Sequence, residues 1–163
     1  MGNGGSLMFQ GLHHCLMDEK GRVAFPAPLR AALDKLAGST SSSGGPVEQF
    51  VITQSLYEPC LVAMSEADFT SQADKVRGLP PSNPAVMQFK RFVIAPASVV
   101  TIDRVGRVGV PKELREYAGL ERECVWAGVI ERIELWSKAK WDELRRAPAD
   151  LEKVREYLER HGL

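Results

Sequence analysis

Two aspartate–arginine pairs, Asp18 with Arg22 and Asp103 with Arg107, are the residues of this sequence whose types and spacing best suit a chemical role. A carboxylate can hold a guanidinium in place, and a guanidinium presents five donors that fit phosphate oxygens or the edge of a guanine base. An Asp–Arg contact across a tight turn also orients that turn, and when exposed it contributes only about 0–1 kcal/mol. We therefore interpret the aspartates as turn-setting residues and the arginines as the candidate functional groups.

Both pairs belong to an internal repeat. The segments DEKGRVAFPAPLR (18–30) and DRVGRVGVPKELR (103–115) lie 85 positions apart and keep the acid, the Gly-Arg, the proline and the Leu-Arg in register. Each segment is predicted to start in a tight β-hairpin, with a glycine, Gly21 or Gly106, at the position where a positive φ is most easily adopted. The repeat therefore predicts two hairpin tips of the same design.

Each hairpin runs into a helix and then into further strands. Pro26 and Pro111 stand where a strand gives way to helical sequence, and proline is favoured near a first helical turn. A strand pair follows in each copy, after which Ser65 or Ser137 begins another helical segment. These serines are 72 positions apart, so the first copy has 13 more residues, which we assign to a Ser/Gly-rich loop at 38–46 and its surroundings.

The length of the chain bounds the number of cores. A chain of 163 residues is one ordinary domain or two very small ones, so the two copies are expected to share one core. The elements predict an α+β fold that is mainly β, with peripheral helices. The expected organisation is a flexible N-terminal extension (1–7), a first repeat (8–66), linking helices (67–97), a second repeat (98–141) and a helical C-terminal tail (142–163).

Composition excludes a membrane-spanning protein and leaves the partner open. The chain is 44% hydrophobic and 26% charged, and no apolar run approaches the roughly 18 residues that cross a bilayer. The N-terminal MGNGGSLMF lacks the build of a secretory signal, so a cytoplasmic location is expected. The formal net charge is zero, with 21 basic and 21 acidic residues, so only local charge can argue for nucleic acid.

Catalytic and metal-binding residues are not predicted. None of the three histidines has a recognisable Ser or Cys companion, and there is no G-x-x-x-x-G-K-[ST] phosphate loop. Cys15, Cys60 and Cys124 form no C-x-x-C pair. In an extended strand only His13 and Cys15 of the sequence HHC (13–15) could point to the same side. The only other histidine is His161, so the chain offers too few ligands for a zinc site. We expect no enzyme activity, no metal and no cofactor.

The hairpin tips are shaped for double-stranded DNA, because a two-stranded ribbon is narrow enough to enter a major groove. The first tip offers Lys20 and Arg22 and the second offers Arg104 and Arg107. Ordinary solvated turn charges are the alternative interpretation. The first segment has three basic residues against two acids and the second has four against two, so their net charges are only +1 and +2. Useful affinity would need several hairpins that engage at once.

The motifs MFQG at Met8, DEKGR, DRVGR, LREYAGL and IELWSKAKW closely resemble the MraZ family of bacterial transcriptional regulators, from Met8 to about Trp141. The resemblance implies tandem SpoVT/AbrB-like, swapped-hairpin half-barrels that complete each other in a single pseudo-symmetric barrel. It also implies cytoplasmic, nucleoid-associated subunits that assemble into a ring-like homo-oligomer. Such rings would bind repeated promoter elements ahead of the division and cell-wall gene cluster.

Carried over residue by residue, the DNA-facing motif of the family falls on both tips. The implied DNA-binding residues are Arg22, Lys20, Arg107 and Arg104, and the turn-setting residues are Asp18, Gly21, Asp103 and Gly106. The second copy has Val105 where the first has Lys20, so unequal contributions are expected, with Arg22 the largest. An oligomeric scaffold or protein-interaction module without sequence-specific DNA binding is the alternative.

Overall fold

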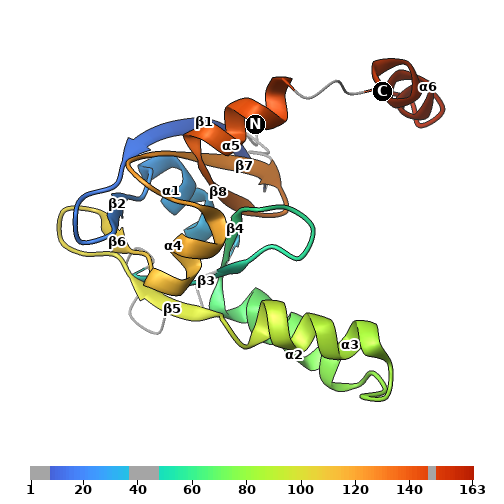
Figure 1. Ribbon diagram of the computed structural model, residues 1–163, viewed down its shortest axis with the longest axis horizontal. Helices are drawn as coiled ribbons and strands as arrows, with labels where there is room; N and C mark the ends of the chain where they lie inside the picture. The colour runs from blue at the N-terminus through green and yellow to red at the C-terminus, as the bar shows by residue number, and fades with distance from the viewer. Residues whose placement is uncertain (1–7, 37–47, 147–149) are drawn as a thin grey trace, which may run out of the picture.

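The computed structural model describes residues 8–36, 48–146 and 150–163 (Figure 1). Within them, strand, strand, helix, strand, strand, helix occurs twice in the same order. The first run is β1 (Phe9–Leu16), β2 (Arg22–Ala24), α1 (Ala27–Leu36), β3 (Gln49–Gln54), β4 (Leu61–Met64) and α2 (Glu66–Arg77). The second is β5 (Ser98–Thr101), β6 (Arg107–Gly109), α4 (Lys112–Ala118), β7 (Glu123–Ile130), β8 (Ile133–Ser137) and α5 (Lys138–Arg146). The helix α3 (Pro84–Phe89) and the π-helix η1 (Lys90–Ile94) lie between the runs, and α6 (Leu151–Glu159) follows them.

The strands form an antiparallel six-stranded sheet, in the order β1-β7-β8-β4-β3-β5, and a two-stranded ribbon of β2 and β6. The expected α+β class is confirmed. The predicted single closed barrel is not formed by the hydrogen bonds of the described strands, because β1 and β5 remain as the two edges of the sheet. The physical reason is that β2 and β6 have three residues each and pair with one another. The predicted β-hairpins are therefore present as tight turns and not as paired strands, because β1 pairs with β7 and β5 with β3, and an isolated bridge from Ile102 to Val108 crosses the second turn.

Strands of the two runs pair with each other. In the ribbon Val23 lies opposite Val108, its counterpart 85 positions later. In the sheet Val62 of β4 lies opposite Glu134 of β8, 72 positions later. The first strand of each run pairs with the third strand of the other, β1 with β7 and β5 with β3. The two runs therefore interlock instead of forming separate sheets.

The strand register also divides the 13 extra residues of the first run. Cys15 lies opposite Cys124 in the β1–β7 pair, and Val100, 85 positions after Cys15, lies opposite Phe50 in the β5–β3 pair. Phe50 and Cys124 are 74 positions apart, so 11 extra residues precede β3 and two lie in the β3–β4 connection. The predicted Ser/Gly loop (38–46) and N-terminal extension (1–7) lie outside the described residues.

One hydrophobic core draws on both runs. Phe25, just after β2, stacks on Phe50 with ring centroids 4.6 Å apart and meets Trp126 of β7 edge-on at 5.2 Å. Leu29 of α1 and Leu114 of α4 occupy equivalent positions, and both are buried in the same cluster. The shared core expected from the length of the chain is therefore confirmed, and the ribbon is attached directly to it.

The helices outside this core begin where their capping residues predict. Ser65 accepts a hydrogen bond from the backbone N–H of Asp68 at 3.0 Å as the N-cap of α2. Asn83 caps α3 by accepting the backbone N–H of Ala85 at 2.9 Å, with Pro84 in the first turn of the helix. In Figure 1, α2 and α3 extend away from the sheet. All of 150–163, including α6 of the predicted C-terminal tail, is exposed.

Candidate nucleic-acid interface

The first hairpin tip is organised by the carboxylate of Asp18. Its Oδ1 accepts the backbone N–H groups of Arg22 at 2.8 Å and of Lys20 at 3.0 Å, and its Oδ2 accepts the Arg22 Nε–H at 2.7 Å. Gly21 closes the turn with φ of 76° and donates its N–H to the carbonyl of Asp18 at 3.0 Å. The left-handed backbone at this position is the reason the turn requires glycine.

The second tip repeats this arrangement. Asp103 Oδ1 accepts the N–H groups of Arg107 at 2.9 Å and of Val105 at 3.0 Å, and Oδ2 accepts the Arg107 Nε–H at 2.9 Å. Gly106 adopts φ of 82° and donates to the Asp103 carbonyl at 3.0 Å. The predicted Asp–Arg contacts are therefore present at both tips.

The turns hold both carboxylates in their ionised form. The N–H of Arg22, followed by its guanidinium, lowers the pKa of Asp18 from its usual range, and Arg107 lowers the pKa of Asp103 in the same way. A carboxylate that accepts several hydrogen bonds favours its charged state, which is the physical cause of both shifts. At neutral pH each aspartate therefore orients the backbone and one arginine together.

The two arginines lie on the same face of the ribbon. Val23 and Val108 point into the core, so Arg22 and Arg107, one position away in each strand, point outward. Arg22 is opposite Gly109, two residues along from Arg107, a diagonal relation that places the Cα atoms about 7–8 Å apart. Each guanidinium is about a third exposed and, within the described residues, hydrogen-bonds its aspartate through Nε alone. The Nη groups remain available to a ligand.

Reciprocal backbone hydrogen bonds join the two tips into one unit. The N–H of Phe25 donates to the carbonyl of Gly106 at 2.8 Å, and the N–H of Val110 donates to the carbonyl of Gly21 at 2.9 Å. Trp126 also donates its indole N–H to the carbonyl of Ala24 at 3.0 Å. The ribbon that carries the two arginines is thereby hydrogen-bonded to the core.

The outermost residues of the tips are not equivalent. Lys20, directly before Gly21, and Arg104, two residues before Gly106, are both exposed. Val105, between Arg104 and Gly106, is 70% exposed. The structure thus brings the predicted Lys20 and Arg22 together at one tip and Arg104 and Arg107 at the other. The two tips therefore differ most clearly at one position, where the first tip exposes the charged Lys20 and the second exposes the apolar Val105.

Arg115 of α4 was not among the predicted site residues, although its guanidinium lies against Gly21 of the first tip. The sequence does contain a signal. Arg30, the counterpart of Arg115, has an acid four positions later on the same helix, Asp34, whereas Arg115 has Gly119. An arginine without an acid at helical spacing is free to reach elsewhere.

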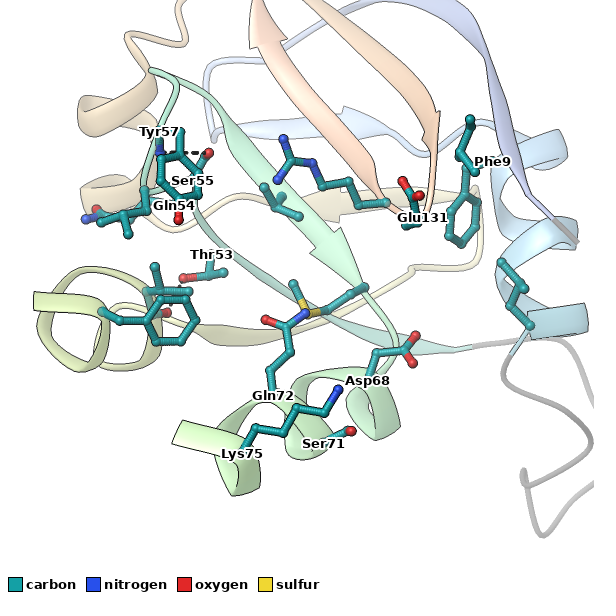
Figure 2. A pocket seen from close by; sticks show the side chains of 18 residues that line it. Phe9, Thr53, Gln54, Ser55, Tyr57, Asp68, Ser71, Gln72, Lys75 and Glu131 are labelled. Carbon is teal, nitrogen blue, oxygen red and sulfur yellow. Dashed lines mark hydrogen bonds between the residues drawn. The ribbon is translucent and has the colours of Figure 1, made fainter. Parts of the chain in front are cut away.

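A cavity of about 470 Å³ lies beside α2, away from the tips (Figure 2). Asp68, Gln72 and Lys75 of α2 form one side, and Phe9 and Glu131 lie at another. Its described lining contains neither a histidine nor a cysteine that could serve a nucleophile. This cavity therefore offers no recognisable catalytic arrangement.

The His13–Cys15 segment of β1 does not gather a ligand set. Cys15 donates its thiol to the carbonyl of Cys124 across the β1–β7 pair at 3.6 Å. Among the residues that the structure describes, no group of three or more His, Cys, Asp or Glu side chains is placed to hold a metal ion. Nor, within the same ranges, is any helix long and apolar enough to cross a membrane.

Comparisons with known proteins place the chain in a family. A family model described as "MraZ protein, putative antitoxin-like" matches residues 93–158, which include the second tip. The protein named "Transcriptional regulator MraZ" of Clostridium beijerinckii is 34% identical over 156 residues, 96% of this chain and all of its own length. The chain belongs to the MraZ family. Its relatives of the same name from Acetivibrio thermocellus and Moorella thermoacetica are 37% and 35% identical over 83% and 88% of this chain, and 85% and 90% of their own lengths.

The MraZ likeness covers both hairpins, because a match of 156 residues leaves only seven of the 163 outside it. The family expected from the repeated motifs is confirmed. In this member of the MraZ family the D-x-x-x-R pattern is thus a turn in which the acid fixes the backbone and aims the arginine, at both tips.

Proposed function

We propose that the chain is a sequence-specific DNA-binding transcriptional regulator that contacts DNA through the outer face of the β2–β6 ribbon. The observation that carries this proposal is the occurrence of the same aspartate-held arginine twice, on one face of one ribbon. Relatives across most of the chain are named as transcriptional regulators and not as enzymes. The pair Arg22 and Arg107 and the flanking Lys20 and Arg104 would then be the DNA-binding residues.

The geometry suits a division of labour between phosphate and base contacts. Two guanidiniums that are aimed by aspartates keep their Nη donors for bidentate contacts with phosphate or guanine. The flexible Lys20 and Arg104 at the edges suit phosphates, which set the position of a protein on the duplex. Because the aspartates fix the arginines before binding, little side-chain entropy remains to be lost on complex formation.

We further propose that the two interlocked runs are tandem AbrB-like, swapped-hairpin halves. The pairing of β1 with β7 and of β5 with β3 supports this, because the first strand of each run pairs with the third strand of the other run. The opposition of Val23 to Val108 and of Val62 to Glu134 supports it independently. Equivalent residues that face each other at two places are what an internal two-fold axis produces.

Affinity argues for several copies on one DNA. The net charge of the chain is zero and the tips carry only a few cations, so one subunit would bind weakly. A ring-like homo-oligomer on repeated promoter elements, ahead of the division and cell-wall gene cluster, would multiply the contacts. Such a regulator acts in the cytoplasm, on the nucleoid. Light scattering tests the assembly by measuring the molecular mass in solution. A monomeric mass at micromolar concentration would contradict the proposed ring.

The function is tested by removing one arginine. Arg22→Ala is expected to lower affinity for the DNA upstream of the chain's own gene by roughly 10–100-fold, the cost of a good bidentate contact. Arg77→Ala is the matched control, because Arg77 also pairs with an aspartate, Asp74, but on α2 and 78% exposed. Fluorescence anisotropy at fixed salt measures both variants.

Two results would speak against the proposal. Equal loss in Arg22→Ala and Arg77→Ala would show that the tip has no special part in binding. A wild-type chain that binds upstream DNA no better than a random duplex of the same length would favour the alternative, an oligomeric scaffold or protein-interaction module without sequence-specific DNA binding.

A further inference from the structure

A third arginine reaches the first tip from the second run. A Cβ built on Gly21 would lie 2.5 Å from Cζ and Nη1 of Arg115 and 2.8 Å from its Nε, so the guanidinium of Arg115 lies directly against this glycine. Gly21 is buried beneath it. At Gly106, the equivalent glycine of the second tip, a Cβ would meet nothing within 4 Å. The two tips therefore differ in their support although their turns are alike.

The charge of Arg115 is not neutralised by the described part of the chain. Arg22 and Arg107 each face an aspartate, whereas Arg115 has no ion pair among the residues that the structure describes. Its Nε is also buried, and no acceptor for it occurs in the part of the chain that the structure describes. A half-buried guanidinium that lacks both a carboxylate and an acceptor is unfavourable by itself, and an anionic ligand relieves that cost.

This arrangement is not a general property of the repeat. Arg30, 85 positions before Arg115, is engaged in an interaction of its own, as is Asp34 four residues later. Glu116, the acid nearest in sequence to Arg115, pairs with Lys112 at 3.8 Å. Glu19 beside the first tip and Glu113 on α4 are exposed and form no ion pair within the described residues. Among the described residues, the second run thus supplies a cation without an ion pair to the first tip, whereas no side chain of the first run lies within 4 Å of a Cβ built on Gly106 at the second tip.

We propose that Arg115 binds a backbone phosphate of DNA together with Lys20, and that the first hairpin is therefore the anchoring tip of the chain. This inference rests on the proposed function and names a further binding residue for it. A phosphate contacted through the Nη groups would supply the anionic partner that the guanidinium lacks within the described residues, and it fits the planar fork of arginine. Asp18 does not compete for that position, since both of its oxygens are committed to the turn.

The salt dependence of binding tests this assignment. Each phosphate contact contributes about 0.9 to the slope of log affinity against log salt concentration on duplex DNA. Arg115→Gln is expected to reduce the slope by about one unit, and Arg115→Lys, which keeps the charge, is expected to retain the wild-type slope. Arg30→Gln is the matched control at the equivalent position, and its slope is expected to equal that of the wild type.

Each outcome decides the assignment. If Arg115→Gln binds more weakly with an unchanged slope, the guanidinium only supports the turn and the phosphate contact is refuted. A slope reduced equally in Arg30→Gln would also refute it. If the wild type itself shows no preference for upstream DNA over a random duplex, the proposed function fails instead. Thermal melting of the Gln and Lys variants identifies any loss that is caused by unfolding.

Discussion

Alanine at the two turn glycines separates backbone strain from the contact with Arg115. Gly21 and Gly106 have φ of 76° and 82°, a region that costs an L-residue about 1–2 kcal/mol. For a chain of this size, 1 kcal/mol corresponds to about 2–4 °C in Tm, so each substitution is expected to lower Tm by roughly 2–8 °C. Gly21→Ala must also displace the Arg115 guanidinium, since the new Cβ would lie 2.5 Å from it.

Differential scanning calorimetry measures the stability effect, and anisotropy measures DNA affinity in the same preparations. We expect Gly21→Ala to lower Tm at least as much as Gly106→Ala and to weaken DNA binding more. Gly109→Ala is the control on the same ribbon, because Gly109 has no positive φ and a Cβ there meets nothing within 4 Å. Alanine at Gly109 is expected to leave Tm unchanged or slightly raised. An unchanged Tm in Gly21→Ala, or a larger loss in Gly106→Ala, would refute the reasoning.

Two further predictions concern ionisation. Because the pKa values of Asp18 and Asp103 are lower in the folded state than in the unfolded chain, the stability they contribute is complete above the usual aspartate pKa of about 3.9 and is lost as pH falls below it. Tm should therefore fall between pH 5 and 3, and the Asp18→Asn, Asp103→Asn double variant should lose less over that range; parallel pH profiles would contradict this. Burial raises the pKa of Cys60 to about 12, so iodoacetamide at pH 8 should modify it slowly in the native chain and rapidly in denaturant, as mass spectrometry would show. Equal rates in both conditions would be inconsistent with a buried thiol.

The features that the sequence predicts correctly are those that depend on neighbouring residues. The turns at Gly21 and Gly106 follow from an acid and a glycine three residues apart, and their hydrogen bonds close within five residues. The cap at Ser65 is equally local. Gly119 ends α4 in a left-handed conformation, as a glycine after a short helix predicts. Local chemistry therefore accounts for both tips and for most helix boundaries.

The features that it does not predict depend on distant pairing. Nothing near Val23 indicates that it faces Val108, and the division of the extra residues around β3 follows only from the register of β5. The position of Arg115 depends on that pairing, because α4 reaches the first tip only when the two runs interlock. The sequence does show that Arg115 has Gly119 and not an acid four positions later. Only the fold shows that its guanidinium lies against Gly21.

The asymmetry between the tips has a consequence for how the chain would lie on DNA. Two tips related by a perfect internal two-fold would bind equally well in either direction along a duplex. Arg115 and Lys20 at the first tip, against Val105 at the second, remove that equivalence. An anchoring tip with extra phosphate contacts and a second tip with fewer gives each subunit a preferred direction. Subunits of one orientation along a strand match elements repeated in the same direction, whereas inverted elements would require alternate subunits to turn around.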